Sequence, residues 1–333
     1  MTGPNRRDTV AGLAALGAAA VLGGSANAAM RLASLVIHGM PATPSVVMAR
    51  LIDAGALAPF AETARLAVWR SPDQMRTGVI SGDMKVFGTP TYSCANMRNR
   101  GVPIRQINVV TWGLLYLMSR DPMVQRIEDI AGRTVLLAFR NDAPDLIFRL
   151  VLRRLGLDPD KDVKLYYVGS ATEAVQLFLA GRADIAVLAE PAASAAEMRA
   201  AQTGVTVYRA VDLTEVHGRL TGQPPRIAQA GLGVHEDFVQ AYPEVVQAIH
   251  DGCVASAHWV LDNPVDAGRL GAALLDLGAA TITRSIPFFR LDVVSAADAR
   301  GDLERYFGDL MEMSPDILGG KLPDDAFYWG RDT

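Results

Sequence analysis

The sequence predicts an α/β protein with two similar lobes, each built on a doubly wound and mostly parallel sheet. Helix-like and strand-like segments alternate along most of the chain, and a βαβαβ pattern occurs twice, about one hundred residues apart. The 333 residues are 50% hydrophobic and 20% charged, with a net charge of −4. This balance is typical of a globular protein with one large or two medium domains, and its mild acidity does not favour nucleic acid as a partner.

The first residues carry the pattern of an export signal. Arg6 and Arg7 precede a weakly apolar stretch of Ala, Gly and Leu, and the small residues at 26–28 fit an A-x-A cleavage site. We therefore expect residues 1–28 to be a signal peptide. The paired arginines favour the twin-arginine route, but Asp8 follows them directly, so the Sec route stays open. The stretch is too short and too rich in Gly and Ala to span a membrane well.

The first half of each repeat is an apolar strand, a Pro-containing turn and an amphipathic helix. Residues 31–55 and 133–157 share this plan. Their continuous apolar runs are typical of buried parallel strands, and the helices have apolar residues at a spacing near 3.6. Gly55 and Gly156 stand where each helix is expected to stop.

The second half of each repeat aligns without a gap, residues 64–86 against residues 163–185. Each copy reads as strand, Ser-containing turn, amphipathic helix, Gly turn and strand. Ser71 matches Ser170, and each is followed by an acidic residue, which predicts that both serines cap a helix N-terminus. The gap-free match favours real internal symmetry over two unrelated α/β stretches.

Two segments are predicted to cross between the lobes. A strand near 107–110 leads through Trp112 into another apolar strand, and a strand near 228–234 fits the return. The expected organisation is lobe 1 from residues 29–113 and 228–333, and lobe 2 from residues 114–227.

The remainder of the chain is predicted to be mostly helical. Residues 244–264 form an amphipathic pattern that stops at an Asn-Pro pair, and residues 295–314 form another. The tail 324–329 can pack its aromatic side chains onto lobe 1. Cys94 and Cys253 either pair as a disulfide or remain buried thiols.

Four stretches resemble a known family: GDMKVFGTPT, IEDIAGRTVLLAF, YYVGSATEAVQLFLAGRADIAVLAEP and FVQAYPEVVQAIHDGCVASAHWVLDNP. Together with the export signal and the doubled lobes, the chain resembles a periplasmic substrate-binding protein of an ABC importer. The most similar subgroup binds sulfonates, nitrate and thiamine precursors. The resemblance implies the type II periplasmic-binding-protein fold, with a ligand cleft between the lobes. It also implies a periplasmic monomer in a Gram-negative bacterium, which passes a small-molecule ligand to an ABC permease and its ATPase.

A ligand is expected beyond the carboxyl ends of the strands, where helix N-termini offer free N–H groups. The candidate ligand-binding residues in the first lobe are His38, Met40, Thr43, Trp69, Gly88, Thr89, Pro90, Thr91 and Trp112. Those in the second lobe are Asn141, Asp142, Ser170 and Glu190. The loop at 88–91 matches the family's main ligand loop.

Several of these residues have a structural alternative. Capping is favoured for Ser170, a satisfied structural role is open for His38, and a core role is open for Trp112. Glu190 either contacts the ligand or makes a salt bridge or cap within its own lobe. Nearby arginines suit an oxyanion, whereas the carboxylates suit a ligand with N–H donors, so the charge of the ligand stays open.

Catalysis is not expected, because the sequence has no G-x-S-x-G, no H-E-x-x-H and no Gly-rich phosphate loop with a Lys. The 5 His and 2 Cys show no metal-ligand spacing, so neither a metal nor a cofactor is predicted. Two alternatives remain for the function. One is a periplasmic ligand sensor or accessory protein, and the other is an enzyme on the same fold, similar to those that make thiamine-pyrimidine or menaquinone precursors.

Overall fold

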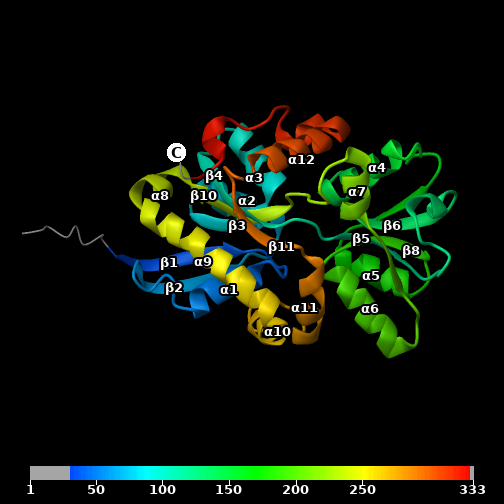
Figure 1. Ribbon diagram of the computed structural model, residues 1–333, viewed down its shortest axis with the longest axis horizontal. Coiled ribbons are helices and arrows are strands. Elements are labelled where there is room, and N and C mark those ends of the chain that lie inside the picture. The colour runs from blue at the N-terminus through cyan, green and yellow to red at the C-terminus, as the bar shows by residue number, and fades with distance from the viewer. Residues whose placement is uncertain (1–30, 331–333) are drawn as a thin grey trace, which may run out of the picture.

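The computed structural model describes residues 31–330 and contains two sheets, one in each half of the molecule (Figure 1). We call the half with the first sheet lobe 1, on the left of Figure 1, and the other half lobe 2. The predicted signal peptide lies outside the described residues. None of the helices within residues 31–330 combines the length and apolarity that crossing a membrane requires.

Lobe 1 is built on a six-stranded sheet. Its strands are β1 (Leu32–Gly39), β2 (Ala61–Val68), β3 (Val86–Pro90), β4 (Ile104–Thr111), β10 (Ala230–His235) and β11 (Leu291–Ser295). The spatial order is β11-β4-β10-β3-β1-β2. β1 pairs in parallel with β2 and β3, as the repeat predicts. The returning strand β10 lies between β3 and β4 and is antiparallel to both, and β11 is antiparallel to β4, so the sheet is mixed.

Lobe 2 is built on a five-stranded sheet. Its strands are β5 (Leu115–Ser119), β6 (Thr134–Ala138), β7 (Lys164–Val168), β8 (Ile185–Ala189) and β9 (Tyr208–Asp212). The order is β7-β6-β8-β5-β9, with β6 parallel to both neighbours and β5 antiparallel to β8 and β9. β6 and β8 occupy the interior of the sheet and are apolar apart from Thr134 at the start of β6, because helices cover both of their faces.

Twelve α-helices pack around the sheets within the described residues. Those that follow lobe 1 strands in the first half of the chain are α1 (Ser45–Asp53), α2 (Pro72–Ser81) and α3 (Thr91–Asn99). Those of lobe 2 are α4 (Ala143–Arg154), α5 (Ala171–Leu179), α6 (Ala192–Thr203) and α7 (Leu213–Thr221). The C-terminal helices are α8 (Glu236–Ala241), α9 (Pro243–Asp262), α10 (Pro264–Ala272), α11 (Ala279–Ser285) and α12 (Arg300–Met313), and short 3₁₀ turns lie at Ile127–Ile130, Ile286–Phe288, Pro315–Leu318 and Asp325–Phe327.

The predicted helix ends are confirmed at the repeated positions. Ser71 accepts a hydrogen bond from the N–H of Gln74 at the start of α2, and Ser170 accepts one from the N–H of Glu173 at the start of α5. Gly55 and Gly156 have φ angles of 71° and 81° just after α1 and α4. This left-handed conformation ends a helix at little cost only when the residue is glycine.

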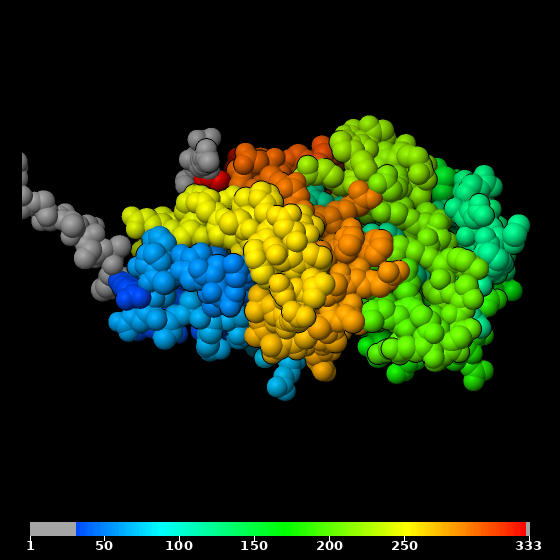
Figure 2. Space-filling view, turned by 60° about the horizontal axis from the view of Figure 1, so that its bottom comes forward, coloured from blue at the N-terminus to red at the C-terminus, as the bar shows by residue number. Residues whose placement is uncertain are grey.

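The C-terminal part covers lobe 1 and also reaches lobe 2. Figure 2 shows α9 and α10, in yellow, covering one face of lobe 1, with the orange chain that follows them lying beside the green lobe 2. Phe327, Tyr328 and Trp329 are buried, and the N–H of Trp329 donates to the carbonyl of Gln106 in β4, which confirms the predicted packing of the tail. Cys94 and Cys253 are both buried free thiols, so the disulfide alternative is not realised.

Candidate functional site

The carboxyl ends of the strands in the two lobes meet at one contact. The hydroxyl of Tyr92, in the first turn of α3, donates a hydrogen bond to the carboxylate of Asp142, which precedes α4. Tyr92 follows β3 in lobe 1 and Asp142 follows β6 in lobe 2. We call the strand-end segments 39–44, 69–71, 88–92, 139–142, 169–170 and 190–191 the cleft loops. This arrangement is the one in which open α/β sheets bind ligands.

Three predicted residues of lobe 1 pack together in the cleft loops. The indole Nε1–H of Trp69 donates to the carbonyl of Gly88 at 3.0 Å. A Cβ atom added to Gly88 would lie 2.9 Å from the side chain of Met48 and 3.4 Å from that of Met40. Glycine at position 88 therefore lets the end of β3 approach the loop after β1 closely.

The three predicted threonines of lobe 1 are buried, and their hydroxyls are already bonded within the protein. Thr91 donates to the carbonyl of Ala228, and the Thr43 and Ser285 hydroxyls lie 3.0 Å apart. Thr89 is fully buried, and its hydroxyl lies 3.3 Å from the Pro90 carbonyl. These contacts hold the start of α1 to α11 and the start of α3 to the returning chain before β10.

His38 and Trp112 differ in how their polar groups are satisfied within the fold. His38 lies within β1, and burial lowers its pKa below the ordinary value, which favours the neutral imidazole. Its Nδ1 is buried and has no hydrogen-bond partner among residues 31–330. The indole of Trp112 donates to the carbonyl of Asp292 at 2.6 Å, and the guanidinium of Arg226 lies 3.7 Å from the centre of its ring. The indole of Trp112 is therefore fixed by contacts within the fold, whereas the Nδ1 of His38 is left without a partner among the described residues.

The polar residues in the loops of lobe 2 differ in whether their side chains are already bonded within the protein. Asp142 accepts from the N–H of Ala143 at 2.8 Å and so caps α4, in addition to its contact with Tyr92. Ser170 caps α5. Asn141 is exposed, with a φ angle of 61°, and its backbone N–H donates to the buried carboxylate of Asp145 at 2.8 Å. Asn141 and the neighbouring Arg140 are thus the exposed polar residues of this loop.

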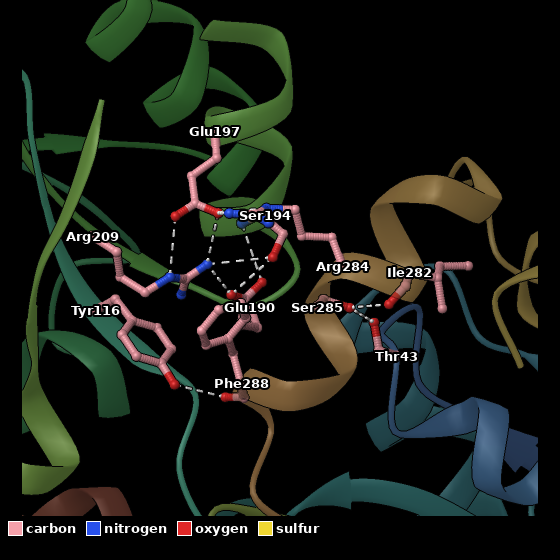
Figure 3. A network of polar contacts seen from close by, with 10 residues as sticks. All are labelled: Thr43, Tyr116, Glu190, Ser194, Glu197, Arg209, Ile282, Arg284, Ser285 and Phe288. Carbon is pink, nitrogen blue, oxygen red and sulfur yellow. Dashed lines mark hydrogen bonds and ion pairs between the residues drawn. The ribbon is translucent and has the colours of Figure 1, made fainter. Parts of the chain in front are cut away.

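Glu190 makes both kinds of structural contact that were the alternatives to ligand contact, a salt bridge and a bond to the start of a helix (Figure 3). Its carboxylate lies 2.6 Å from the guanidinium of Arg209 and accepts from the N–H and the hydroxyl of Ser194 at 3.2 and 3.1 Å. Burial raises the pKa of Glu190, and the positive charge of Arg209 opposes this shift. The carboxylate is therefore bound to α6 and β9 of its own lobe.

The Glu190 pair is the first link of a chain of ion pairs that reaches lobe 1 (Figure 3). Glu197 in α6 lies 3.3 Å from Arg209 and 2.9 Å from Arg284 in α11. The Arg209 guanidinium also stacks 4.2 Å from the centre of the Tyr116 ring and 3.7 Å from that of Phe288. The sequence did not predict Arg209, because it lies on β9 and reaches its partner across the intervening strand β5.

A cavity of about 200 Å³ beside the crossing segments is lined by the predicted Trp112, together with Arg226 and Arg290. Two larger cavities lie where the lobes meet, away from the predicted residues. One, of about 380 Å³, is lined by Tyr116, Arg209, Asp212, Pro287, Phe288 and Arg290. The other, of about 390 Å³, lies between α7, α12 and the crossing segment at 223–227. Its polar groups are paired across the lobes, since Asp309 lies 2.6 Å from Arg154 and 2.7 Å from His217. No single element pattern in the sequence indicates either cavity, because both are assembled from segments far apart in the chain.

Within residues 31–330, no group of three or more His, Cys, Asp or Glu side chains is arranged to hold a metal ion. The side chains of the cleft loops offer hydrogen-bond donors and acceptors and aromatic surface. Such an arrangement can bind a small solute between two lobes.

Comparison with known proteins agrees with this architecture. Residues 88–273 match the model of the NMT1-like family. An ABC transporter protein from Parabacteroides distasonis is 22% identical with a TM-score of 0.76, and the match covers 90% of this chain and 99% of that one. The periplasmic aliphatic sulphonate binding protein SsuA from Escherichia coli is 15% identical with a TM-score of 0.69, covering 90% and 92%. The periplasmic nitrate-binding protein NrtA from Synechocystis PCC 6803 is 14% identical with a TM-score of 0.57, covering 76% and 70%. No curated protein matches the sequence. The shared architecture confirms the predicted two-lobed type II fold.

Proposed function

Because the chain belongs to the NMT1-like family, we propose that it is a solute-binding protein that captures a small organic molecule in the periplasm and delivers it to an ABC-type permease. The observation that carries the proposal is the meeting of strand ends from two separate sheets at the Tyr92–Asp142 contact. Binding proteins with this architecture close two lobes around a solute, and a membrane partner reads the closed form. The names of the similar structures, which include sulphonate-binding and nitrate-binding proteins, support the same class of function.

The proposal assigns residues 29–113 and 228–333 to lobe 1 and residues 114–227 to lobe 2. The strand composition of the two sheets supports this division, since β1–β4, β10 and β11 form one sheet and β5–β9 form the other. Export to the periplasm is proposed from the signal pattern in residues 1–28 and from the periplasmic proteins among the similar structures. The ABC permease and its ATPase are the proposed partners.

Within the cleft loops we assign the exposed Asn141 and its neighbour Asp142 to direct contact with the solute. Met40, Trp69, Gly88, Pro90 and the threonines at 43, 89 and 91 shape the lobe 1 wall. Glu190 acts through its charge and through its hold on α6, because its oxygens are engaged by Ser194 and Arg209.

The test is to identify the solute that the mature protein carries. Protein purified from the periplasm is denatured, the released molecule is identified by mass spectrometry, and its affinity is measured by calorimetry. Replacing the exposed Asn141 with Ala is expected to weaken binding by about tenfold, the usual effect of one lost polar contact at a site. The matched control is Lys321→Ala, which changes an exposed residue outside the cleft loops. Turnover of the bound molecule, or capture of no molecule at all, would contradict the proposal.

A further inference from the structure

An exposed aromatic ring stands at the cleft end of lobe 2 in an unusual backbone conformation. Phe139 directly follows β6, has a φ angle of 62° and leaves 45% of its surface exposed. Asn141, two residues later, also has a positive φ of 61°. A bulky residue rarely adopts the left-handed region, since its Cβ crowds the backbone there. Phe139 is not among the predicted ligand-binding residues, because in the sequence it reads as the last residue of an apolar strand.

The surrounding hydrogen bonds impose this conformation. The N–H of Phe139 donates to the carbonyl of Val168 at 3.2 Å, and the carbonyl of Phe139 accepts from the N–H of Asp142 at 3.1 Å. The N–H of Asn141 donates to Asp145, whose fully buried carboxylate also accepts from the hydroxyl of Tyr167 at 2.8 Å. Backbone strain held in place in this way is characteristic of ligand clamps and other functional sites.

The location of the loop relates the ring to the cleft. β6 is the second of the five strands in the sheet order, and residues 139–142 connect its carboxyl end to α4. Asp142, three residues after Phe139, touches Tyr92 of lobe 1. Arg140, between the ring and the amide of Asn141, places its guanidinium 5.2 Å from the centre of the Tyr167 ring. The loop thus combines an exposed ring with an exposed guanidinium and an exposed amide.

We propose that Phe139 is a specificity-determining residue of the cleft, a lobe 2 ring against which the flat or apolar face of the solute packs. The inference rests on the proposed function and adds to it the class of solute: a small molecule with a ring or an apolar plane, and a polar group that Arg140 or Asn141 reads. An aromatic ring that remains exposed at this place loses its water contact when such a face covers it, which stabilises the bound state.

The decisive variant is Phe139→Gly, with Asn141→Gly as the matched control. Glycine adopts positive φ without crowding, so both variants relieve a strained position and are expected to keep or raise the melting temperature. Only Phe139→Gly removes the ring. Phe139→Tyr keeps the ring and is expected to retain binding.

The probes are benzoate and benzylamine, each compared with its counterpart without a ring, acetate and methylamine, by ligand-observed NMR on the full mature protein. At least one ring-bearing probe is expected to bind the wild-type protein more tightly than its counterpart. Phe139→Gly is expected to lose that advantage, by about tenfold in affinity. Asn141→Gly removes the amide that we assign to solute contact and retains Phe139, so it is expected to weaken the two members of each probe pair by the same factor and to preserve the preference for the ring.

Three outcomes of the probe measurements would overturn this role of Phe139 as a clamp for the solute: no preference for a ring in the wild-type protein, an undiminished preference in Phe139→Gly, or an equal loss of the preference in Asn141→Gly. The proposed function is judged separately, by the solute released from wild-type protein. A released solute that has no ring or apolar plane leaves the proposed function standing and refutes the clamp. A protein that captures no solute fails the proposed function itself. If the protein prefers ring-bearing probes only when a second protein is bound to it, Phe139 belongs to a docking surface for that protein and not to the cleft.

Discussion

Individual residues of the cleft loops show why residue type alone does not decide a role. Ser170 and Glu190 were both candidates for ligand contact, and the structure bonds Ser170 to the start of α5 and Glu190 to Arg209 and Ser194. The capping role of Ser170 was predictable, because an acidic residue three positions later is a local signal. The partner of Glu190 was not predictable, since Arg209 comes from a different strand and no local pattern links the two.

The raised pKa of Glu190 leads to a prediction about pH. Burial raises this pKa above its unfolded value, so the unfolded state releases its proton first as the pH rises. The wild-type protein should therefore lose stability, relative to Glu190→Gln, as the pH rises from the pKa of Glu190 in the unfolded state through its pKa in the folded state. Above that range, the difference in free energy of unfolding between the two proteins should be constant. Urea unfolding of both proteins across this range measures it. Glu128→Gln, at an exposed position, is the control for losing one charge. If the wild-type protein instead gains stability relative to Glu190→Gln as the pH rises, the charge of Arg209 affects the pKa of Glu190 more than burial does.

At the scale of elements, the repeat predicted the order of strands and helices along the chain. It did not predict where strands from distant parts of the chain are placed within a sheet. The two gap-free copies became β2-α2-β3 and β7-α5-β8, with serine caps at matching positions. The position of β10 between β3 and β4, antiparallel to both, was not predictable from periodicity, because pairing over more than one hundred residues leaves no local signal. For the same reason the positive φ of Phe139 was hidden, since it depends on bonds to β7 and α4.

The matching caps give a prediction for the elements α2 and α5. Ser71→Ala and Ser170→Ala each remove the acceptor of an N–H in the first helical turn, and each is expected to lower the free energy of unfolding by about 0.5–2 kcal/mol. Chemical denaturation measures the loss, and Ser71→Asn and Ser170→Asn, which keep a capping side chain, should recover most of it. If Ser170→Ala weakens solute binding while Ser170→Asn, equally stable, does not restore it, the hydroxyl contacts the solute directly.

For the molecule as a whole, contacts outside the crossing segments join the lobes. Asp309 in α12 of lobe 1 holds Arg154 and His217 of lobe 2, and Arg284 in α11 holds Glu197 in α6. The two lobes and their cleft were predicted from the repeat and the family resemblance. These side contacts were not, because α12 reads in sequence only as an amphipathic helix with a charged face.

The Asp309 contact leads to a prediction about lobe closure. Asp309→Asn keeps the shape of the side chain but removes the charge that attracts the guanidinium of Arg154 and the carboxylate that faces the ring of His217, so it should cost about 1.5–3 kcal/mol of interlobe attraction. The variant is expected to populate a more open form, with a larger radius of gyration in solution scattering than the wild-type protein has. Asp302→Asn is the control, because it alters an acid of the same helix that pairs with Arg305, one turn further along that helix. An equal expansion in both variants would exclude a specific role for Asp309.

The order of strands in the first sheet also determines when each lobe can be finished during synthesis. All strands of the second sheet lie between Leu115 and Asp212, so a nascent chain has that sheet complete once those residues have emerged. The first sheet has begun earlier, yet it lacks the strand at its middle until β10 appears and its edge until β11 appears. The half of the protein that starts first therefore finishes last. Completion of the first sheet therefore requires nearly the entire chain.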